Sequence, residues 1–360
     1  PLADATFAAA EWLLRLFEPD VAANPEIVEL RIGDFGVLVG PQCSGIEGFA
    51  LIAGFMALYL AMFRRDLRFP RALILIPVGI ALSWLLNVVR IVSLVMIGAH
   101  VSPELAVEGF HSHAGWLMFT LLSLSLAAAA HGAPWLRRAA PVRAARPARA
   151  LPPLPEDWNA ARILPFVAFM ATALLSSTFL ETPEIAYPAR FAATLAALLF
   201  FRRALARLDW RVDPAAVALG VAIGVAWVVT AEAPPAEDPL GAALAALPLW
   251  AFALWVATRV LGTAVLVPIV EELVFRSYLI ERLDPGARIG RAAGLVVAIA
   301  ISTGLFAALH DRWVAAALAG LVFAGFALRR GRIADAIWCH AAANATIAAA
   351  ALATGRWALI

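Results

Sequence analysis

Two groups of residues in the sequence could carry chemistry, and the first combines a thiol, a guanidinium and two imidazoles. Cys43 stands in the stretch Pro-Gln-Cys-Ser-Gly at 41–45, Arg90 lies in a long apolar run, and His111 and His113 precede another. A thiolate is a nucleophile that a nearby cation activates, an imidazole transfers protons near neutral pH, and a guanidinium donates hydrogen bonds to an oxyanion. Such a set suits attack on a peptide carbonyl through a thioester.

Each of these residues also has an inert interpretation. A lone cysteine at a helix start can simply pack, the two histidines can be exposed loop residues, and Arg90 can extend to the lipid headgroups. Arginine inside an apolar run costs about 2.5–3.5 kcal/mol on insertion scales, which makes a functional role the first hypothesis for Arg90.

The second group places polar side chains inside apolar stretches: Glu271, Glu272, Arg276, His310, His340 and Asn344. Glu272 and Arg276 are four residues apart, so on a helix they share a face and can pair. Glu271 then points about 100° away from them around the helix. His340 and Asn344 share a face in the same way.

Several chemistries are compatible with this second group. In water-mediated hydrolysis, Glu271 and His310 would hold and deprotonate water, while His340 or Asn344 supports the oxyanion. Glu271, His310 and His340 could instead bind a divalent metal such as zinc. The same side chains could relay protons in a transporter, or they could only link helices by hydrogen bonds.

The elements that must position these residues are membrane helices. The chain has 360 residues, of which 63% are hydrophobic and 15% charged, against about 45–50% and about 25% in soluble domains. Ten stretches are apolar enough to span a bilayer of about 30 Å: Gly45–Phe63, Ala72–Ala99, Ala114–Ala130, Ile163–Leu180, Phe191–Phe201, Pro214–Thr230, Leu240–Leu279, Ala292–His310, Val314–Leu328 and Ile333–Thr354. The sequence predicts an all-α polytopic membrane protein with about ten transmembrane helices in two bundles. The seventh stretch is too long for one span and is expected to contain a break or an interfacial helix.

Charge placement orients the chain and divides it. Arginine-rich loops alternate with acidic or neutral loops, so the basic loops are expected on the cytoplasmic side. Cys43, Arg90 and His111 then converge at the outer face. A Pro-, Ala- and Arg-rich stretch at 132–159 predicts a cytoplasmic linker between membrane domains at 1–131 and 160–360. Basic residues fall in short runs between apolar stretches, so lipids are expected around the chain and no nucleic-acid partner is expected.

The first group resembles the signature blocks of exosortases, membrane-embedded cysteine transpeptidases of bacterial envelopes. The similar stretches are Gly40-Pro-Gln-Cys-Ser-Gly-Ile-Glu-Gly48, Asn87-Val-Val-Arg-Ile91 and Phe110-His-Ser-His-Ala-Gly-Trp116. The resemblance implies that Cys43 is the nucleophile, with Arg90 and His111 as partners and His113 as a second choice. Exosortases usually have more spans before the Cys block, and the sequence begins at Pro1, so we expect it to start part-way into a longer precursor.

The second group resembles the three motifs of the CPBP family, intramembrane proteases similar to CAAX prenyl endopeptidases. The motifs are Glu271-Glu272-x-x-x-Arg276, Phe306-x-x-x-His310 and His340-x-x-x-Asn344. The resemblance implies that Glu271 and His310 activate water and that His340 and Asn344 aid the oxyanion. Glu272 and Arg276 then have structural roles, and both metal-dependent and glutamate-dependent mechanisms remain open.

The order of the two modules resembles exosortase E fused to a C-terminal protease domain, a type associated with VPEID-CTERM sorting tails. We therefore expect a bifunctional peptidase of the bacterial inner membrane whose partners are envelope proteins with C-terminal sorting tails. The alternative is a transporter or scaffold in which the polar residues relay ions or link helices. A transporter of the common kind would show paired broken helices in related halves, and we find no internal repeat.

Overall fold

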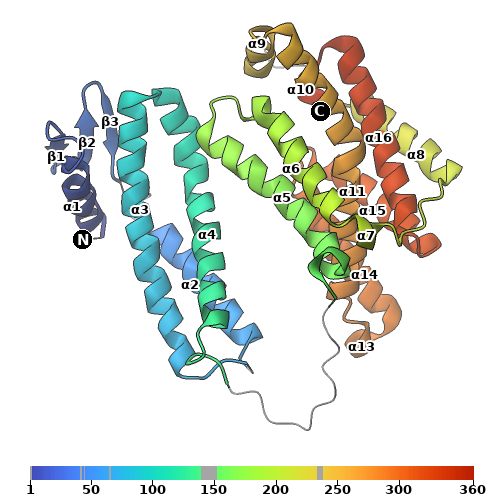
Figure 1. The fold of residues 1–360 in the computed structure, drawn as a ribbon, viewed down its shortest axis with the longest axis horizontal. Coiled ribbons are helices and arrows are strands. Elements are labelled where there is room, and N and C mark those ends of the chain that lie inside the picture. The colour runs from blue at the N-terminus through green and yellow to red at the C-terminus, as the bar shows by residue number, and fades with distance from the viewer. Residues whose placement is uncertain (1, 41–42, 44, 65, 139–151, 233–237) are drawn as a thin grey trace. The chain divides into compact units, whose positions relative to one another are not determined.

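The computed structural model describes residues 2–40, 43, 45–64, 66–138, 152–232 and 238–360 (Figure 1). Residues 139–151 of the predicted linker at 132–159 lie outside this part of the chain, as do Pro41, Gln42 and Ser44 of the Cys block. Contacts divide the chain into two compact units, one of residues 1–148 with 174–183 and one of residues 149–173 with 184–360. Helix α5 (Trp158–Phe179) contributes residues to both.

The first unit begins with a small α/β element for which the sequence patterns made no prediction. Helix α1 (Leu2–Arg15) is followed by strands β1 (Ala22–Asn24), β2 (Glu29–Ile32) and β3 (Phe35–Leu38). The strands form an antiparallel sheet in the order β1-β2-β3, with Leu30 opposite Ala23 and Val37. Leu30 and residues of α1 pack against the helix α3 (Leu75–His100), so this element is part of the unit's core.

Three helices form the body of the first unit: α2 (Ile46–Met62), α3 (Leu75–His100) and α4 (His111–Gly132). A short 3₁₀ turn η2 (Arg71–Ile74) precedes α3, and a π-helical turn η3 (Leu105–Phe110) leads into α4. The Arg68 amide donates to the Leu136 carbonyl at 2.7 Å, and the Arg138 amide donates to Asp66 at 2.9 Å. Both basic loops therefore lie at one end of the unit, away from the starts of α2 and α4.

The second unit is helical throughout the part that the structure describes. After turn η4 (Leu154–Glu156) and helix α5 come η5 (Pro183–Ala186), α6 (Tyr187–Phe200), α7 (Arg202–Leu205), α8 (Pro214–Val229) and α9 (Pro239–Ala245). The remaining elements are α10 (Leu249–Leu261), η6 (Gly262–Leu266), α11 (Val267–Glu272), η7 (Leu273–Leu279), α12 (Ile280–Leu283), α13 (Gly286–Ile289), α14 (Arg291–Ala307), α15 (Trp313–Arg329), α16 (Ile333–Thr354) and η8 (Trp357–Leu359).

The overlong apolar stretch at 240–279 is broken, as the sequence predicted. Helix α9 ends at Ala245, and Pro248 precedes a continuous helical rod from Leu249 to Leu283. Within this rod, the π-helical turns η6 and η7 flank the single α-helical segment α11 that ends in Glu271 and Glu272. Short π segments inside α-helices occur frequently at functional sites.

Helices α8 and α16 approach closely because two glycines of α8 face α16. A Cβ on Gly220 would lie 2.1 Å from the Cys339 carbonyl oxygen, and a Cβ on Gly224 would lie 2.5 Å from that of Ala343. Small residues four apart allow membrane helices to pack backbone to backbone. This packing fixes α16, which carries His340 and Asn344.

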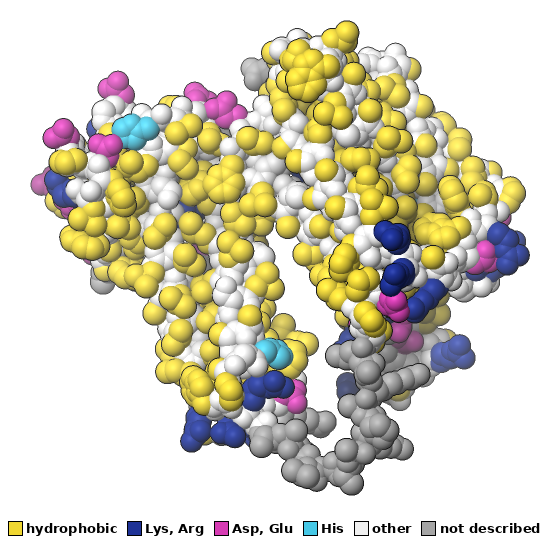
Figure 2. Space-filling model, in the orientation of Figure 1, with side chains coloured by type: hydrophobic (Ala, Val, Ile, Leu, Met, Phe, Trp, Pro, Cys, Tyr) yellow, Lys and Arg dark blue, Asp and Glu magenta, His cyan; other side chains and the backbone are white. Residues whose placement is uncertain are grey.

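The prediction of an all-α polytopic membrane protein is confirmed, apart from the small sheet. Five helical segments of the described residues are long and apolar enough to cross a membrane: Arg71–His100, His111–Gly132, Trp158–Phe179, Leu249–Ile289 and Ile333–Thr354. Four shorter apolar helices accompany them, namely Ile46–Met62, Pro214–Val229, Arg291–Ala307 and Trp313–Arg329. The predicted span at 191–201 corresponds to α6, which has 14 residues and is not among these nine. Hydrophobic side chains cover most of the helical surface in view (Figure 2).

Candidate active sites

The first candidate site lies where α2 and α4 begin and α3 approaches its end. Cys43 is half-buried just before α2, Arg90 is in the second half of α3, and His111 is the first residue of α4. Arg90 and His111 line a cavity of about 170 Å³. Three residues far apart in the sequence are thus brought to one end of the first unit.

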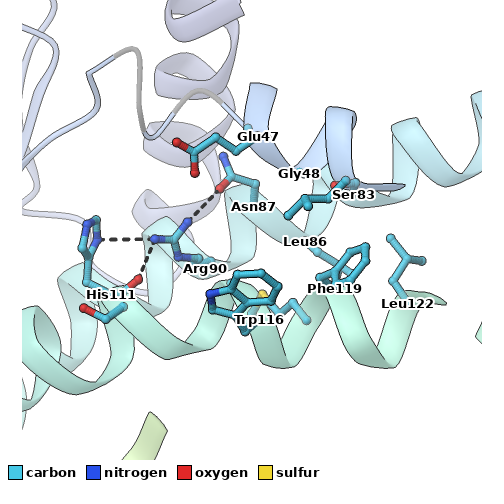
Figure 3. Close-up of a pocket in the computed structure, with 15 residues that line it drawn as sticks. Glu47, Gly48, Ser83, Leu86, Asn87, Arg90, His111, Trp116, Phe119 and Leu122 are labelled. Carbon is cyan, nitrogen blue, oxygen red and sulfur yellow. Dashed lines mark hydrogen bonds between the residues drawn. The ribbon is translucent and has the colours of Figure 1, made fainter. Parts of the chain in front are cut away.

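A row of hydrogen bonds connects Cys43 to His111 through α3. The Asn87 side-chain amide donates to the Cys43 carbonyl at 2.7 Å, and Arg90 Nη1 lies 3.5 Å from Asn87 Oδ1. Arg90 Nη2 donates to the His111 carbonyl at 2.7 Å and lies 3.5 Å from His111 Nδ1. In Figure 3 the guanidinium lies between Asn87 and His111, so this cation links the backbone of the Cys block to the start of α4.

Burial, Arg90 and Glu47 set the ionisation of the Cys43 thiol. Burial raises the pKa of Cys43, the Arg90 guanidinium lowers it, and the Glu47 carboxylate raises it, with a net increase above the ordinary value. The activating effect expected of Arg90 is therefore present but outweighed. A thiol that is neutral at rest needs a base to take its proton during attack.

His111 is better placed than His113 to act as the base that takes the proton of the Cys43 thiol. His111 is exposed and lines the cavity beside Arg90, whereas His113 Nδ1 lies 3.1 Å from the Gly109 carbonyl in the preceding turn η3. His113 does not line the cavity.

Two contributors to the first site were missed by the sequence analysis. Asn87 belongs to a motif that was quoted but received no role, although a polar side chain three residues before Arg90 in an apolar run is a usable signal. Glu47 acts electrostatically on both Cys43 and Arg90. Its position in the first turn of α2, four residues after Cys43, could have indicated this.

The second candidate site is a cavity of about 330 Å³ inside the second unit. Glu271 from α11, His310 from the residues after α14, and His340 and Asn344 from α16 all line it. The structure therefore brings together the four residues that the sequence selected for hydrolysis. His310 follows the end of α14 at Ala307, and its Nδ1 lies 2.9 Å from the Phe306 carbonyl.

Glu272 is the centre of a buried polar group behind this cavity. Its Oε1 accepts from Arg276 Nη1 at 3.2 Å, as the four-residue spacing predicted, and lies 2.9 Å from His340 Nδ1. The exposed fractions are 0% for Glu272, 3% for Arg276 and 4% for His340. The contact with His340 was not predicted, and it gives Glu272 a role in orienting an imidazole that lines the cavity.

Aromatic rings and a glycine enclose this group. The His340 ring stacks on Phe323 with centroids 4.6 Å apart, and the Arg276 guanidinium lies 4.0 Å from the centroid of the Phe306 ring. A Cβ on Gly320 would lie 2.8 Å from Arg276 Nη2, so a side chain at this position would displace the guanidinium.

Glu271 differs from its neighbour because it faces the cavity. Its Oε2 is buried, makes no hydrogen bond, and lies 3.9 Å from His340 Nε2. A buried unpaired acceptor is costly and calls for a partner such as water or substrate. Asn344 is already engaged, since its side-chain amide donates to the Thr263 carbonyl at 2.9 Å.

The zinc alternative rests on Glu271, His310 and His340. Among the residues that the structure describes, no group of three His, Cys, Asp or Glu side chains has an arrangement that could hold a metal ion. Nδ1 of His340 faces the Glu272 carboxylate and Nδ1 of His310 faces the Phe306 carbonyl, which leaves the other nitrogen of each ring available, as in many metal-ligating histidines. The metal alternative therefore stays a prediction, and no step below uses a metal.

Comparison with protein families assigns each site to a separate region. Residues 1–128 match the family described as transmembrane exosortase (Exosortase_EpsH), and residues 249–346 match type II CAAX prenyl endopeptidase Rce1-like. No curated protein and no solved structure matches the chain. The first match contains Cys43, Arg90 and His111, and the second contains Glu271, His310, His340 and Asn344. The chain is therefore a multi-pass membrane protein in which a region that matches the exosortase model is followed by a region that matches the Rce1-like CAAX prenyl endopeptidase model.

Proposed function

We propose that the first unit is a cysteine-dependent peptidase or transpeptidase that cuts C-terminal sorting tails from envelope proteins at the outer face of a bacterial inner membrane. The exosortase match supports the class of reaction. The hydrogen-bonded row from Cys43 through Asn87 and Arg90 to His111 carries the assignment of residues.

In this mechanism the Cys43 sulfur attacks the scissile carbonyl carbon while His111 accepts the thiol proton. Arg90, already beside His111, stabilises the oxyanion of the tetrahedral intermediate. The C–N bond then breaks, His111 returns the proton to the departing amine, and a thioester remains. Water or an acceptor amine attacks the thioester, and its proton passes to the Cys43 sulfur through His111.

The test of the first unit uses a tailed envelope protein followed by gel shift in cells. Cys43→Ser is compared with the matched variant Cys339→Ser, a buried thiol in the second unit, at equal membrane levels. We expect the tail to stay uncut with Cys43→Ser and to be processed normally with Cys339→Ser. Normal processing with Cys43→Ser overturns the assignment of the nucleophile.

We propose that the second unit, which contains most of the predicted domain at 160–360, hydrolyses a peptide bond within the membrane. The Rce1-like match supports the class, and one observation carries the assignment of residues. The unpaired Glu271 carboxylate oxygen faces a cavity that His310 and His340 also line.

Glu271 is the base in this mechanism. Its carboxylate takes a proton from a water held between it and His310, and the water oxygen attacks the carbonyl carbon. His340, whose Nδ1 donates to Glu272, is protonated on both nitrogens in this step and donates from Nε2 to the oxyanion. The Asn344 amide donates its second N–H, since the first is donated to the Thr263 carbonyl. When the C–N bond breaks, Glu271 transfers its proton to the departing amine, which restores the carboxylate.

The test of the second unit compares the protein termini in membranes by mass spectrometry. Cells carry wild-type protein, Glu271→Gln, or the control Glu181→Gln, whose side chain is exposed in a loop. We expect termini that are present with wild-type protein and Glu181→Gln and are absent with Glu271→Gln. Identical termini in all three favour the alternative in which these polar residues relay ions or link helices.

A further inference from the structure

The catalytic cavity of the second unit adjoins a larger cavity that the proposed hydrolysis does not use. This larger cavity, the vestibule, has a volume of about 1000 Å³. Five residues line both cavities, namely Trp227, Leu309, His310, Leu359 and Ile360. The vestibule therefore meets the catalytic cavity at His310, one of the two residues proposed to hold the attacking water.

Charged side chains line much of the vestibule. They are Glu232, Asp238, Asp311, Arg312 and Arg356. Charged residues within membrane proteins lie almost always in the protein interior or beside a water-filled cavity, because lipid cannot solvate them. The vestibule is therefore a place where water and the polar backbone of a peptide can reach His310.

The floor of the vestibule is recessed because the helices beneath it are short. Helices α8, α14 and α15 have 16, 17 and 17 residues, which is about 24–26 Å at the helical rise of about 1.5 Å per residue. A bilayer core is about 30 Å thick. Arg312, in the turn between α14 and α15, donates to the Trp227 carbonyl at 2.7 Å and to the Thr230 hydroxyl. This turn therefore lies level with the end of α8, below the membrane surface.

Helix α16 extends past this floor and forms a wall. Gly220 of α8 faces the Cys339 carbonyl of α16. One turn later Gly224 faces the carbonyl of Ala343, so the two helices run in the same direction. The end of α8 lies five positions after Gly224 and is thus level with position 348 of α16. Helix α16 continues for six more residues, which is about 9 Å.

The turn η8 after α16 continues this wall and is fixed on two sides. The Trp357 ring lies 5.5 Å from the Trp255 ring and 5.9 Å from the Phe252 ring, both of α10. Arg356 Nη2 donates to the Glu232 carbonyl, beyond the end of α8, at 2.7 Å. The walls thus stand on the long helices α10 and α16, around a floor made by the short ones.

The vestibule lies at the end of the second unit opposite its arginine-rich loops. Arg332 pairs with Asp209 at 3.3 Å, and Arg329 pairs with Asp213, which caps the start of α8. Helix α8 thus begins among the basic residues and ends at the vestibule. Helix α9, whose first turn adjoins the vestibule, and α13, in an arginine-rich loop, lie at opposite ends of the unit (Figure 1). Because basic loops stay in the cytoplasm, the vestibule faces the outer side of the membrane.

We propose that water and substrate reach Glu271 through the vestibule, so that the second unit cuts peptides presented on the outer face of the membrane. This inference rests on the proposed proteolysis and adds its substrate class. The substrates are segments at the outer ends of membrane spans, in proteins that have already crossed the membrane. The reaction that supplies them is protein export or an earlier cleavage on the outer face.

The first test asks from which side a thiol in the catalytic cavity can be reached. Cys43→Ser with Cys339→Ser removes both cysteines of the chain. Val267→Cys then places one thiol in the catalytic cavity, one turn before Glu271. The matched variant Ile269→Cys places it two residues further along the same rod, in a separate apolar groove. The probe is a membrane-impermeant methanethiosulfonate, applied to sealed vesicles of each orientation.

The thiol of Val267→Cys should react in right-side-out vesicles and stay unlabelled in inverted vesicles. Asp311→Cys, in the vestibule, should behave in the same way, and Ile269→Cys should stay unlabelled in both. Arg288→Cys, exposed in an arginine-rich loop, should react only in inverted vesicles. Reaction of Val267→Cys from the inverted side, from both sides or from neither overturns the proposal, as does reaction of Arg288→Cys in right-side-out vesicles.

A separate measurement distinguishes this inference from the proposed proteolysis. Protein termini that are present with wild-type protein and absent with Glu271→Gln are mapped by mass spectrometry onto the membrane topology of their parent proteins. We expect these termini at the outer ends of spans, and termini in cytoplasmic segments overturn the proposed substrate class. If no termini depend on Glu271 while Val267→Cys reacts from the outer side, the proteolysis is wrong and the vestibule admits water alone.

Discussion

The two candidate sites differ in how much protein surrounds them. At the first, His111 is exposed and Cys43 is half-buried at the end of a three-helix unit. At the second, Glu271 is 6% exposed and Glu272 is fully buried inside a helical rod flanked by π segments. The first resembles a surface site adjusted by a few charges, and the second is a polar group within an apolar core.

This difference in burial predicts that the two sites respond differently to mutation. In the second unit the buried polar residues are hydrogen-bonded to one another, because Glu272 contacts both Arg276 and His340. Removing Glu272 takes this carboxylate partner away from both Arg276 and His340. In the first unit, solvent can replace a lost partner at His111, so mutations should affect chemistry more than folding.

The largest expected effect is on the buried pair of the second unit. Glu272→Ala should lower the free energy of unfolding by about 3–5 kcal/mol, because it leaves Arg276 as an uncompensated buried charge. Arg90→Ala, the counterpart in the first unit, should cost about 1.5–3 kcal/mol, the value of a lost charged hydrogen bond. Denaturation in detergent micelles measures both.

The double variant Glu272→Gln with Arg276→Met is the control for this prediction. It removes both charges together and should recover most of the loss. If Glu272→Ala is no more destabilising than Arg90→Ala, the contrast between a buried and an open site is wrong.

Helix packing in the second unit gives the next largest effect. Gly220→Leu should destabilise the protein by about 1–3 kcal/mol, because any Cβ at this position meets the Cys339 backbone. Gly304→Leu, in α14, is the matched control, since a Cβ there meets nothing within 4 Å. Melting temperatures of the two variants, together with terminus analysis of membranes, measure the effect.

Gly220→Leu should also reduce peptide cleavage by the second unit, because α16 carries His340 and Asn344. Tail processing by the first unit should stay at the wild-type level. Equal melting temperatures for Gly220→Leu and Gly304→Leu would show that the close approach of α8 and α16 is not needed for stability.

The sequence predicted much of this arrangement because polar residues in apolar stretches are rare and costly. Glu271, His310, His340 and Asn344 were selected on that basis, and all four line one cavity. The pairing of Glu272 with Arg276 followed from their spacing alone. The division of the overlong stretch near Pro248 followed from its length.

Other features depend on contacts that no local pattern reveals. The bond between Glu272 and His340 joins residues 68 positions apart, and the link from Asn87 to the Cys43 carbonyl joins residues 44 apart. The N-terminal sheet has strands of only three or four residues, too short for a clear period-two pattern. No local sequence pattern predicts the π turns on either side of α11.

The smallest predicted effect is at the first site, where single charges change the pKa of the Cys43 thiol. Because the pKa of Cys43 is raised, alkylation of Cys43 by iodoacetamide should accelerate about tenfold per pH unit from pH 7, without levelling off below about pH 8.5. The rate is measured in the Cys339→Ser background, so that the label reports a single thiol. A rate that levels off near pH 7 would show a stabilised thiolate and contradict the raised pKa.

Two charge variants should move this alkylation profile in opposite directions. Glu47→Gln removes a carboxylate that raises the pKa of Cys43, so the profile should shift to lower pH and alkylation at pH 7.5 should be a few-fold faster. Arg90→Gln removes the cation that lowers the pKa, so the profile should shift to higher pH and alkylation should slow. Glu181→Gln, an exposed loop variant, should leave the profile unchanged. Shifts of the same sign for Glu47→Gln and Arg90→Gln would mean that access to the thiol, and not its ionisation, controls the reaction.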